Sequence, residues 1–132
     1  MKYLYIYALT LPWLILGDLI WLGIIMRSTY ARVFGQLFRE HILIWPALVF
    51  YLLFSIGLVV FAIIPALKAE SIQTAIYLGS LLGFIAYMTY DMTNAATLKS
   101  WPIGWLMFLD ILWGTFIAGL SSAIGYLLSR SL

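Results

Sequence analysis

The chain has 132 residues, of which 65% are hydrophobic and only 9% are charged. Soluble domains carry about 25% charged residues, and a chain of this length has too little interior to hide so much apolar surface from water. These values exclude an ordinary soluble fold and predict one domain that lies in lipid. The net charge of +2 is too thinly spread for a nucleic-acid-binding face, and the lack of cysteine excludes disulfides and thiolate metal sites.

Four apolar runs are long enough to cross a bilayer, which takes about 20 residues of helix. They cover residues 3–26, 42–64, 74–98 and 102–128. All basic residues lie outside these runs: Lys2, Arg27, Arg32, Arg39, Lys68, Lys99 and Arg130. Because lipid offers no partners to free backbone groups, each run should be a helix. We therefore predict an all-α integral membrane four-helix bundle, with residues 1–132 forming a single transmembrane domain.

The first run is too long for a signal peptide and contains Asp18, so we expect a retained helix that Pro12 bends. In the break that follows, 27–41, apolar residues recur at helical spacing with polar residues between them. This pattern predicts a short interfacial helix. Its apolar positions are Tyr30, Val33, Phe34, Leu37 and Phe38, and its polar positions are Arg32, Gln36, Arg39 and Glu40.

The two later breaks are shorter. Pro65 is expected to stop the second helix, and Pro102 suits the first turn of the fourth helix after a tight turn over 99–102. The first and third breaks together carry four basic residues against three on the other side, which favours both termini outside. Aromatic residues near the helix ends predict an interfacial belt. They are Tyr3, Tyr5, Trp45, Trp101, Trp105 and Tyr126.

Three aspartates, Asp18, Asp91 and Asp110, are the only charged residues within the predicted helices. A charged group at the centre of a membrane helix costs about 2.5–3.5 kcal/mol, and a four-helix bundle does not require one. Each aspartate lies seven or eight residues from the end of its run, on the side of the first and third breaks. At 1.5 Å per residue, all three are expected at one level, roughly 10–12 Å below that face.

Aromatic and polar residues accompany the aspartates at helical spacing. Two of the aspartates are followed by a tryptophan at i+3, and the third has a tyrosine at i−4 and an asparagine at i+3. The predicted binding residues are therefore Asp18, Asp91, Asp110, Asn94, Tyr87, Trp21 and Trp113. Three carboxyl groups at one level, with no basic residue inside the helices, should hold a proton, a cation or a cationic group.

Small residues at i+4 spacing form ridges on the third and fourth predicted helices and should let helices approach closely. One ridge consists of Ala75, Gly79, Gly83, Tyr87, Asp91 and Ala95, and the other of Gly114, Ala118 and Ser122. Because the first ridge carries Asp91, this aspartate is expected to face protein rather than lipid.

The thirteen residues 90–102, YDMTNAATLKSWP, resemble the signature of a family of predicted membrane proteins, domain of unknown function number 2177. The Asp18-x-x-Trp21-Leu22-Gly23 and Asp110-x-x-Trp113-Gly114 segments and the placement of Tyr30 are also similar to it. The resemblance covers essentially the whole chain. It implies a four-helix, multi-pass protein of the bacterial cytoplasmic (inner) membrane, and it supplies no activity, substrate, cofactor or catalytic residue.

Three functions remain open. The three aspartates and the residues around them could bind or transport a proton, a cation or a small amphiphile within the membrane lipids. At this size a transport pathway would need a homodimer, with the small-residue ridges as candidate interfaces. Alternatively, paired carboxyl groups could serve an intramembrane enzyme acting on a lipid or other apolar substrate, or the chain could be a non-catalytic subunit or stabiliser. Buried polar residues can also serve only to join helices, at about 0.6–2 kcal/mol each. We favour binding over catalysis, because the sequence shows no clear nucleophile–base pair.

Overall fold

The computed structural model of the chain describes residues 1–35, 37 and 39–131, and these residues form helices and loops without a strand. The first span is α1 (Lys2–Ile20) with a π-helical segment, η1 (Trp21–Ile25). A short helix, α2 (Arg27–Phe34), follows. The second span is α3 (Ile44–Leu58), η2 (Val59–Ile63) and α4 (Ile64–Lys68), and the last two are α5 (Ile72–Thr97) and α6 (Trp105–Ser129).

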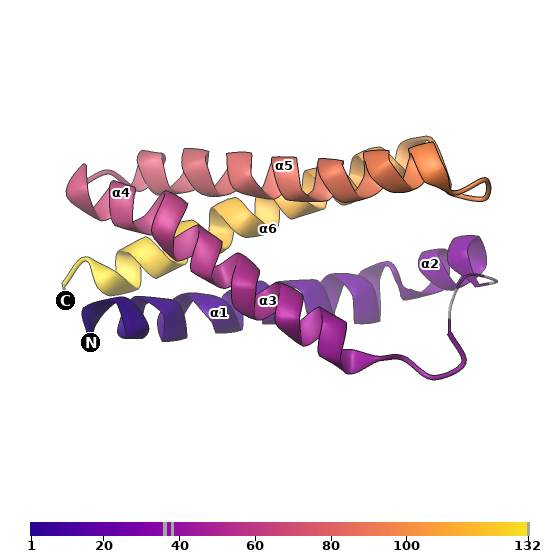
Figure 1. The fold of residues 1–132 in the computed structure, drawn as a ribbon. Helices are drawn as coiled ribbons and strands as arrows, with labels where there is room; N and C mark the ends of the chain where they lie inside the picture. The colour runs from indigo at the N-terminus through magenta and orange to yellow at the C-terminus, as the bar shows by residue number, and fades with distance from the viewer. Residues whose placement is uncertain (36, 38, 132) are drawn as a thin grey trace.

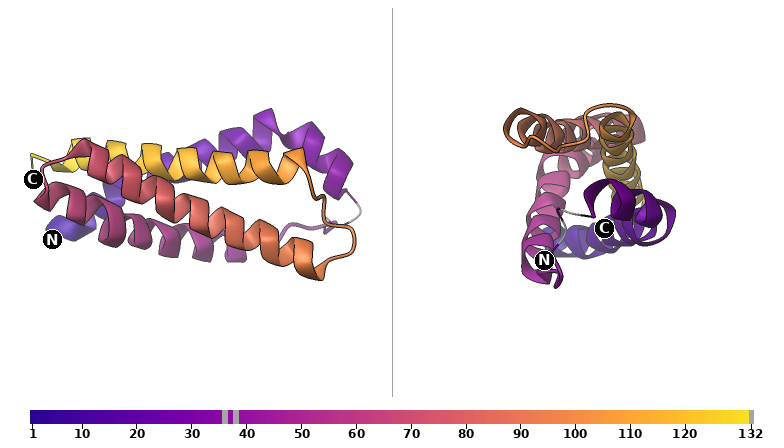
Figure 2. Two further views of the ribbon diagram at one scale, coloured as in Figure 1. Left: turned by 90° about the horizontal axis from the view of Figure 1, so that it is seen from above. Right: turned by 90° about the vertical axis from the view of Figure 1, so that its right-hand side faces the viewer.

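All four spans are long and apolar enough to cross a membrane, which confirms the predicted all-α membrane bundle. Both termini lie at one end of the bundle, and α2 and the α5–α6 loop lie at the other (Figure 1). The most extensive helix contact is between α5 and α6, and α6 also packs on α1. In contrast, α3 crosses the bundle obliquely and separates from α5 toward its own N-terminus (Figures 1 and 2).

The small-residue ridges interlock inside the chain, as predicted for the ridge that carries Asp91. A Cβ atom added to Gly83 would collide with the carbonyl oxygen of Gly114, and one added to Gly114 would collide with the ring of Tyr87. The two helices therefore approach so closely that only glycine fits at these positions. This finding corrects the proposal that the ridges serve as dimer interfaces, because α5 and α6 already cover them.

The prediction that Pro65 stops the second helix is wrong, since α4 continues to Lys68. Proline lacks a backbone N–H, and its ring clashes with the carbonyl group four residues before it. Here the proline follows the π-helical turn η2, whose wider hydrogen-bonding pattern is one of the known ways in which helices accommodate such a disruption.

The α5–α6 connection also differs from its prediction. α6 begins at Trp105 rather than at Pro102, after a loop in which Gly104 has a φ of 144°. This loop is longer than a tight turn because Trp101 turns back into the bundle. Its ring centroid lies 5.1 Å from that of Phe34 and 5.3 Å from that of Tyr90.

Two of the six aromatic residues that were assigned to the interfacial belt do not lie at the outer surface of the bundle. Trp101 is half-buried, and Tyr126 is only 7% exposed, in a core cluster with Ile6 and Ile63. The remaining four, Tyr3, Tyr5, Trp45 and Trp105, are exposed.

The helix α2 is shorter than the pattern over 27–41 indicated. Its Tyr30 is buried and its Phe34 is half-buried, so this face turns toward the bundle. Gln36 and Phe38, which belonged to the predicted pattern, lie outside the described residues.

Candidate functional site

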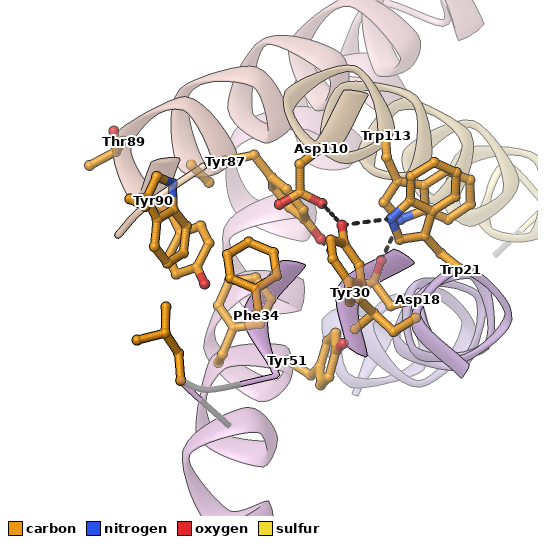
Figure 3. A pocket seen from close by; sticks show the side chains of 15 residues that line it. Asp18, Trp21, Tyr30, Phe34, Tyr51, Tyr87, Thr89, Tyr90, Asp110 and Trp113 are labelled. Carbon is orange, nitrogen blue, oxygen red and sulfur yellow. Dashed lines mark hydrogen bonds between the residues drawn. The ribbon is translucent and has the colours of Figure 1, made fainter. Parts of the chain in front are cut away.

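A cavity of about 700 Å³ lies in the half of the bundle that contains α2. Its wall comes from all four spans, from α2 and from the α5–α6 loop (Figure 3). Nine of the lining residues are aromatic: Trp21, Tyr30, Phe34, Phe50, Tyr51, Tyr87, Tyr90, Trp101 and Trp113. Two carboxyl groups, those of Asp18 and Asp110, supply the acidic part of the lining, and no basic side chain belongs to the lining as described.

Asp18 is only 3% exposed, and its carboxyl group accepts hydrogen bonds from side chains of other helices. The indole Nε1–H of Trp113 on α6 donates to its Oδ1 at 2.7 Å, and the hydroxyl of Tyr87 on α5 donates to its Oδ2 at 3.0 Å. The hydroxyl of Tyr51 on α3 also interacts with this carboxyl group. Hydrogen bonds to one acidic side chain on α1 thus join α1 to α5 and α6, and Tyr51 brings α3 close to the same group.

The carboxyl group of Asp110 is hydrogen-bonded to a side chain of α2. The Tyr30 hydroxyl donates a hydrogen bond to Asp110 Oδ1 and accepts one from Trp21 Nε1 at 3.3 Å. Burial raises the pKa of the Tyr30 phenol, and the hydrogen bond and negative charge of Asp110 raise it further. Tyr30 therefore stays protonated and remains a donor to this carboxyl group.

The two Asp-x-x-Trp segments face each other across the α1–α6 contact. The rings of Trp21 and Trp113 stack with their centroids 4.5 Å apart and their planes within 3°. Each indole N–H is directed at the aspartate side of the opposite segment: Trp113 donates to Asp18, and Trp21 reaches Asp110 through Tyr30 (Figure 3). Because α1 and α6 run antiparallel, an i+3 spacing on both helices produces this reciprocal arrangement.

The remaining two predicted site residues lie outside the cavity lining. Asp91 is 2% exposed, and its Oδ2 is buried without a hydrogen-bond partner in the described structure. The Trp101 side chain lies near this carboxyl group, and its Nε1 is likewise buried without a hydrogen-bond partner among the described residues. Asn94 is half-buried and does not contribute to the lining.

The three aspartates nevertheless form one electrostatic cluster. Asp18 acts on Asp110, and Asp110 acts on Asp91. The described residues contain no group of three or more histidine, cysteine, aspartate or glutamate side chains placed to hold a metal ion. The polar groups that line the site include carboxyl groups, which are surrounded by aromatic rings and by phenol and indole donors.

Sequence reasoning missed part of this wall. Tyr30 was assigned to an apolar face, Trp101 to the interfacial belt, and Tyr51 to no role. The polar residue nearest to Tyr51 at helical spacing is Ser55 at i+4, and this pair does not distinguish a site residue from one that only packs helices. The role of Tyr51 follows from the way α3 crosses α1.

The fold and the cavity define a small multi-pass membrane protein with a buried carboxylate–aromatic site. A family described as predicted membrane protein (DUF2177) matches residues 3–127. The chain belongs to this family, which confirms the resemblance drawn from residues 90–102. No curated protein and no solved structure matches the chain.

Proposed function

We propose that the protein binds a lipophilic organic cation, a molecule with a positively charged head and an apolar body. The observation that carries the proposal is the cavity itself, which joins two carboxyl groups to nine aromatic side chains. Its volume lies within the roughly 300–1,000 Å³ that small-molecule sites occupy. Aromatic faces attract cations by about 2 kcal/mol or more when water is excluded.

The form of the cavity favours such a molecule over a proton or a small inorganic ion. Those species need only a few oxygen ligands, whereas most of this wall is aromatic carbon. Between the two carboxyl groups, Asp110 is the better first contact for a charged head. It is partly exposed, whereas both oxygens of Asp18 accept hydrogen bonds within the protein.

The family resemblance supports a location in the bacterial cytoplasmic membrane. Transport of the cation would require, in addition to binding, an opening toward the end that carries the termini. We expect a homodimer if such a pathway exists.

Radiolabelled tetraphenylphosphonium, a permanent lipophilic cation, would test the proposal on protein in lipid nanodiscs, with protein-free nanodiscs subtracted. We expect saturable binding that Asp110→Asn weakens at least about tenfold, which corresponds to about 1.4 kcal/mol. Glu70→Gln is the matched control, because Glu70 is an exposed carboxylate outside this cavity lining, and the affinity of this variant should stay within about threefold.

Tetraphenylborate has the same shape and the opposite charge, and it should not compete. If Asp110→Asn binds the cation as tightly as the wild type, or if the borate competes equally well, the proposal is wrong.

A further inference from the structure

One wall of the cavity is much less closed than the others. Residues 44–50, in the N-terminal half of α3, are all exposed, and α3 has few contacts with α5. The contrast with the close α5–α6 packing is visible in Figures 1 and 2, where α3 separates from α5 toward the cavity end.

Side chains on both sides of this separation line the cavity and are also open to the outside. Phe50 on α3 is 39% exposed, and Tyr90 on α5 is 53% exposed. Tyr90 lies seven residues before the end of its span at Thr97, roughly 10 Å below the membrane face at 1.5 Å per residue. At that depth the outside of the bundle is at the hydrocarbon region rather than water.

The second span is packed unevenly along its length: residues 44–50 of α3 are exposed, whereas Ser55 and Leu58 near its C-terminal end are fully buried. Beyond α3, the π-helical segment η2 is anchored by the buried residues Val59, Ala62 and Ile63. Polar contacts near the cavity end come from Tyr51, which interacts with Asp18, and from Leu52, whose carbonyl accepts a 3.4 Å hydrogen bond from Tyr7. π-Helical turns often occur at functional positions within helices, and helices bend at them.

We propose that the cavity is loaded sideways from the bilayer through the gap between α3 and α5. On this basis the ligand is a membrane-dissolved alkyl amphiphile with a cationic head. The head lies at Asp110, and the alkyl chain extends between Phe50 and Tyr90 into the lipid. The ligand class rests on the proposed function, whereas the route of entry can be tested without any ligand.

The chain contains no cysteine, so single cysteines can report access directly. Ala86→Cys places a thiol in the cavity wall from α5. We would compare its rates of reaction with an alkyl maleimide dissolved in the bilayer and with a charged, membrane-impermeant methanethiosulfonate. Leu53→Cys, on the exposed side of α3, is the reference for lipid access, and Ser100→Cys, in the exposed α5–α6 loop, is the reference for water.

We expect Ala86→Cys to resemble Leu53→Cys, with an alkyl maleimide to methanethiosulfonate rate ratio at least tenfold above that of Ser100→Cys. A ratio close to that of Ser100→Cys would show that the cavity opens to water, and would overturn the route while leaving the tetraphenylphosphonium result intact.

A separate competition experiment tests the class of ligand. Decyltrimethylammonium should displace tetraphenylphosphonium at lower concentrations than tetramethylammonium, by at least tenfold after correction for partitioning into protein-free nanodiscs. Equal potency after this correction would refute the alkyl-chain subsite. Loss of all cation binding, with Ala86→Cys still labelled from the bilayer, would instead refute the proposed function and leave the route standing.

Discussion

Replacing Tyr30 by phenylalanine removes one hydroxyl group that joins the two halves of the site. This hydroxyl donates to Asp110 and accepts from Trp21, whereas the packing of the ring on Phe34, with centroids 5.6 Å apart, should persist. Interhelical hydrogen bonds in membranes average about 0.6 kcal/mol, so two such bonds together contribute about 1.2 kcal/mol. Leaving a buried polar group unpaired costs about 1–3 kcal/mol. We therefore expect the free energy of unfolding to fall by about 1–3 kcal/mol.

The assay is equilibrium unfolding in mixed micelles of the wild type, Tyr30→Phe, Asp110→Asn and the double variant. Because the two residues share a hydrogen bond, their effects should not add, and the double-mutant cycle should give a coupling of about 1 kcal/mol. Tyr77→Phe makes the same change at an α5 side chain that is 67% exposed, and it should alter stability by less than about 0.5 kcal/mol.

Additivity of Tyr30→Phe and Asp110→Asn within about 0.3 kcal/mol would refute this reasoning. A loss of the same size in Tyr77→Phe would also refute it, because removal of any tyrosine hydroxyl would then be sufficient.

Three further changes test the packing, the stacked indoles and the buried phenol. Gly83→Val should destabilise the protein by about 1–3 kcal/mol in the same assay, since its side chain would strike α6, whereas Gly23→Ala, with open space around it, should not. Trp113→Phe should abolish an exciton couplet in far-ultraviolet circular dichroism from the stack with Trp21. The wild type and Tyr30→Phe should show equal tyrosinate absorbance at pH 10–11, because burial and then Asp110 raise the pKa of Tyr30 above its usual value of about 10.

A specific result would contradict each of these three predictions. Equal stability of Gly83→Val and the wild type would contradict the close helix approach, and a couplet that survives in Trp113→Phe would contradict the stack. Because the pKa of Tyr30 is raised, the folded state favours the protonated phenol. Its stabilising contribution is present below about pH 10 and is lost only as the pH rises through the folded-state pKa. A tyrosinate signal from Tyr30 near pH 10 would contradict this.

Much of the fold could be predicted because lipid imposes simple rules on a sequence. Charges at the breaks and long apolar runs between them define four helices, and the glycine ridge on α5 correctly indicated the face that meets α6. The errors occurred where prolines were interpreted by local rules alone. Pro65 lies within a helix because a π-helical turn precedes it, and Pro102 lies in a loop because Trp101 packs into the bundle.

The acidic part of the site could also be located from the sequence, because aspartates inside apolar helices are rare and costly. Five of the seven predicted residues line the cavity, and Asp91 and Asn94 do not. The partners of the carboxyl groups could not be found in this way. A tyrosine on an amphipathic segment or within an apolar run has the same local pattern whether it faces lipid or an aspartate.

The sequence by itself determined that this protein lies in lipid and that it has four spans, since both follow from hydropathy and helix length. The shared depth of the three aspartates stays a prediction from the same reasoning. Only the tertiary structure showed that Tyr30 of α2 hydrogen-bonds to Asp110 of α6 and that α3 separates from α5. It also showed the cavity that the four spans and α2 enclose. These features depend on the crossing of helices and on contacts between residues up to 95 positions apart in the chain, and helical periodicity carries no information about either.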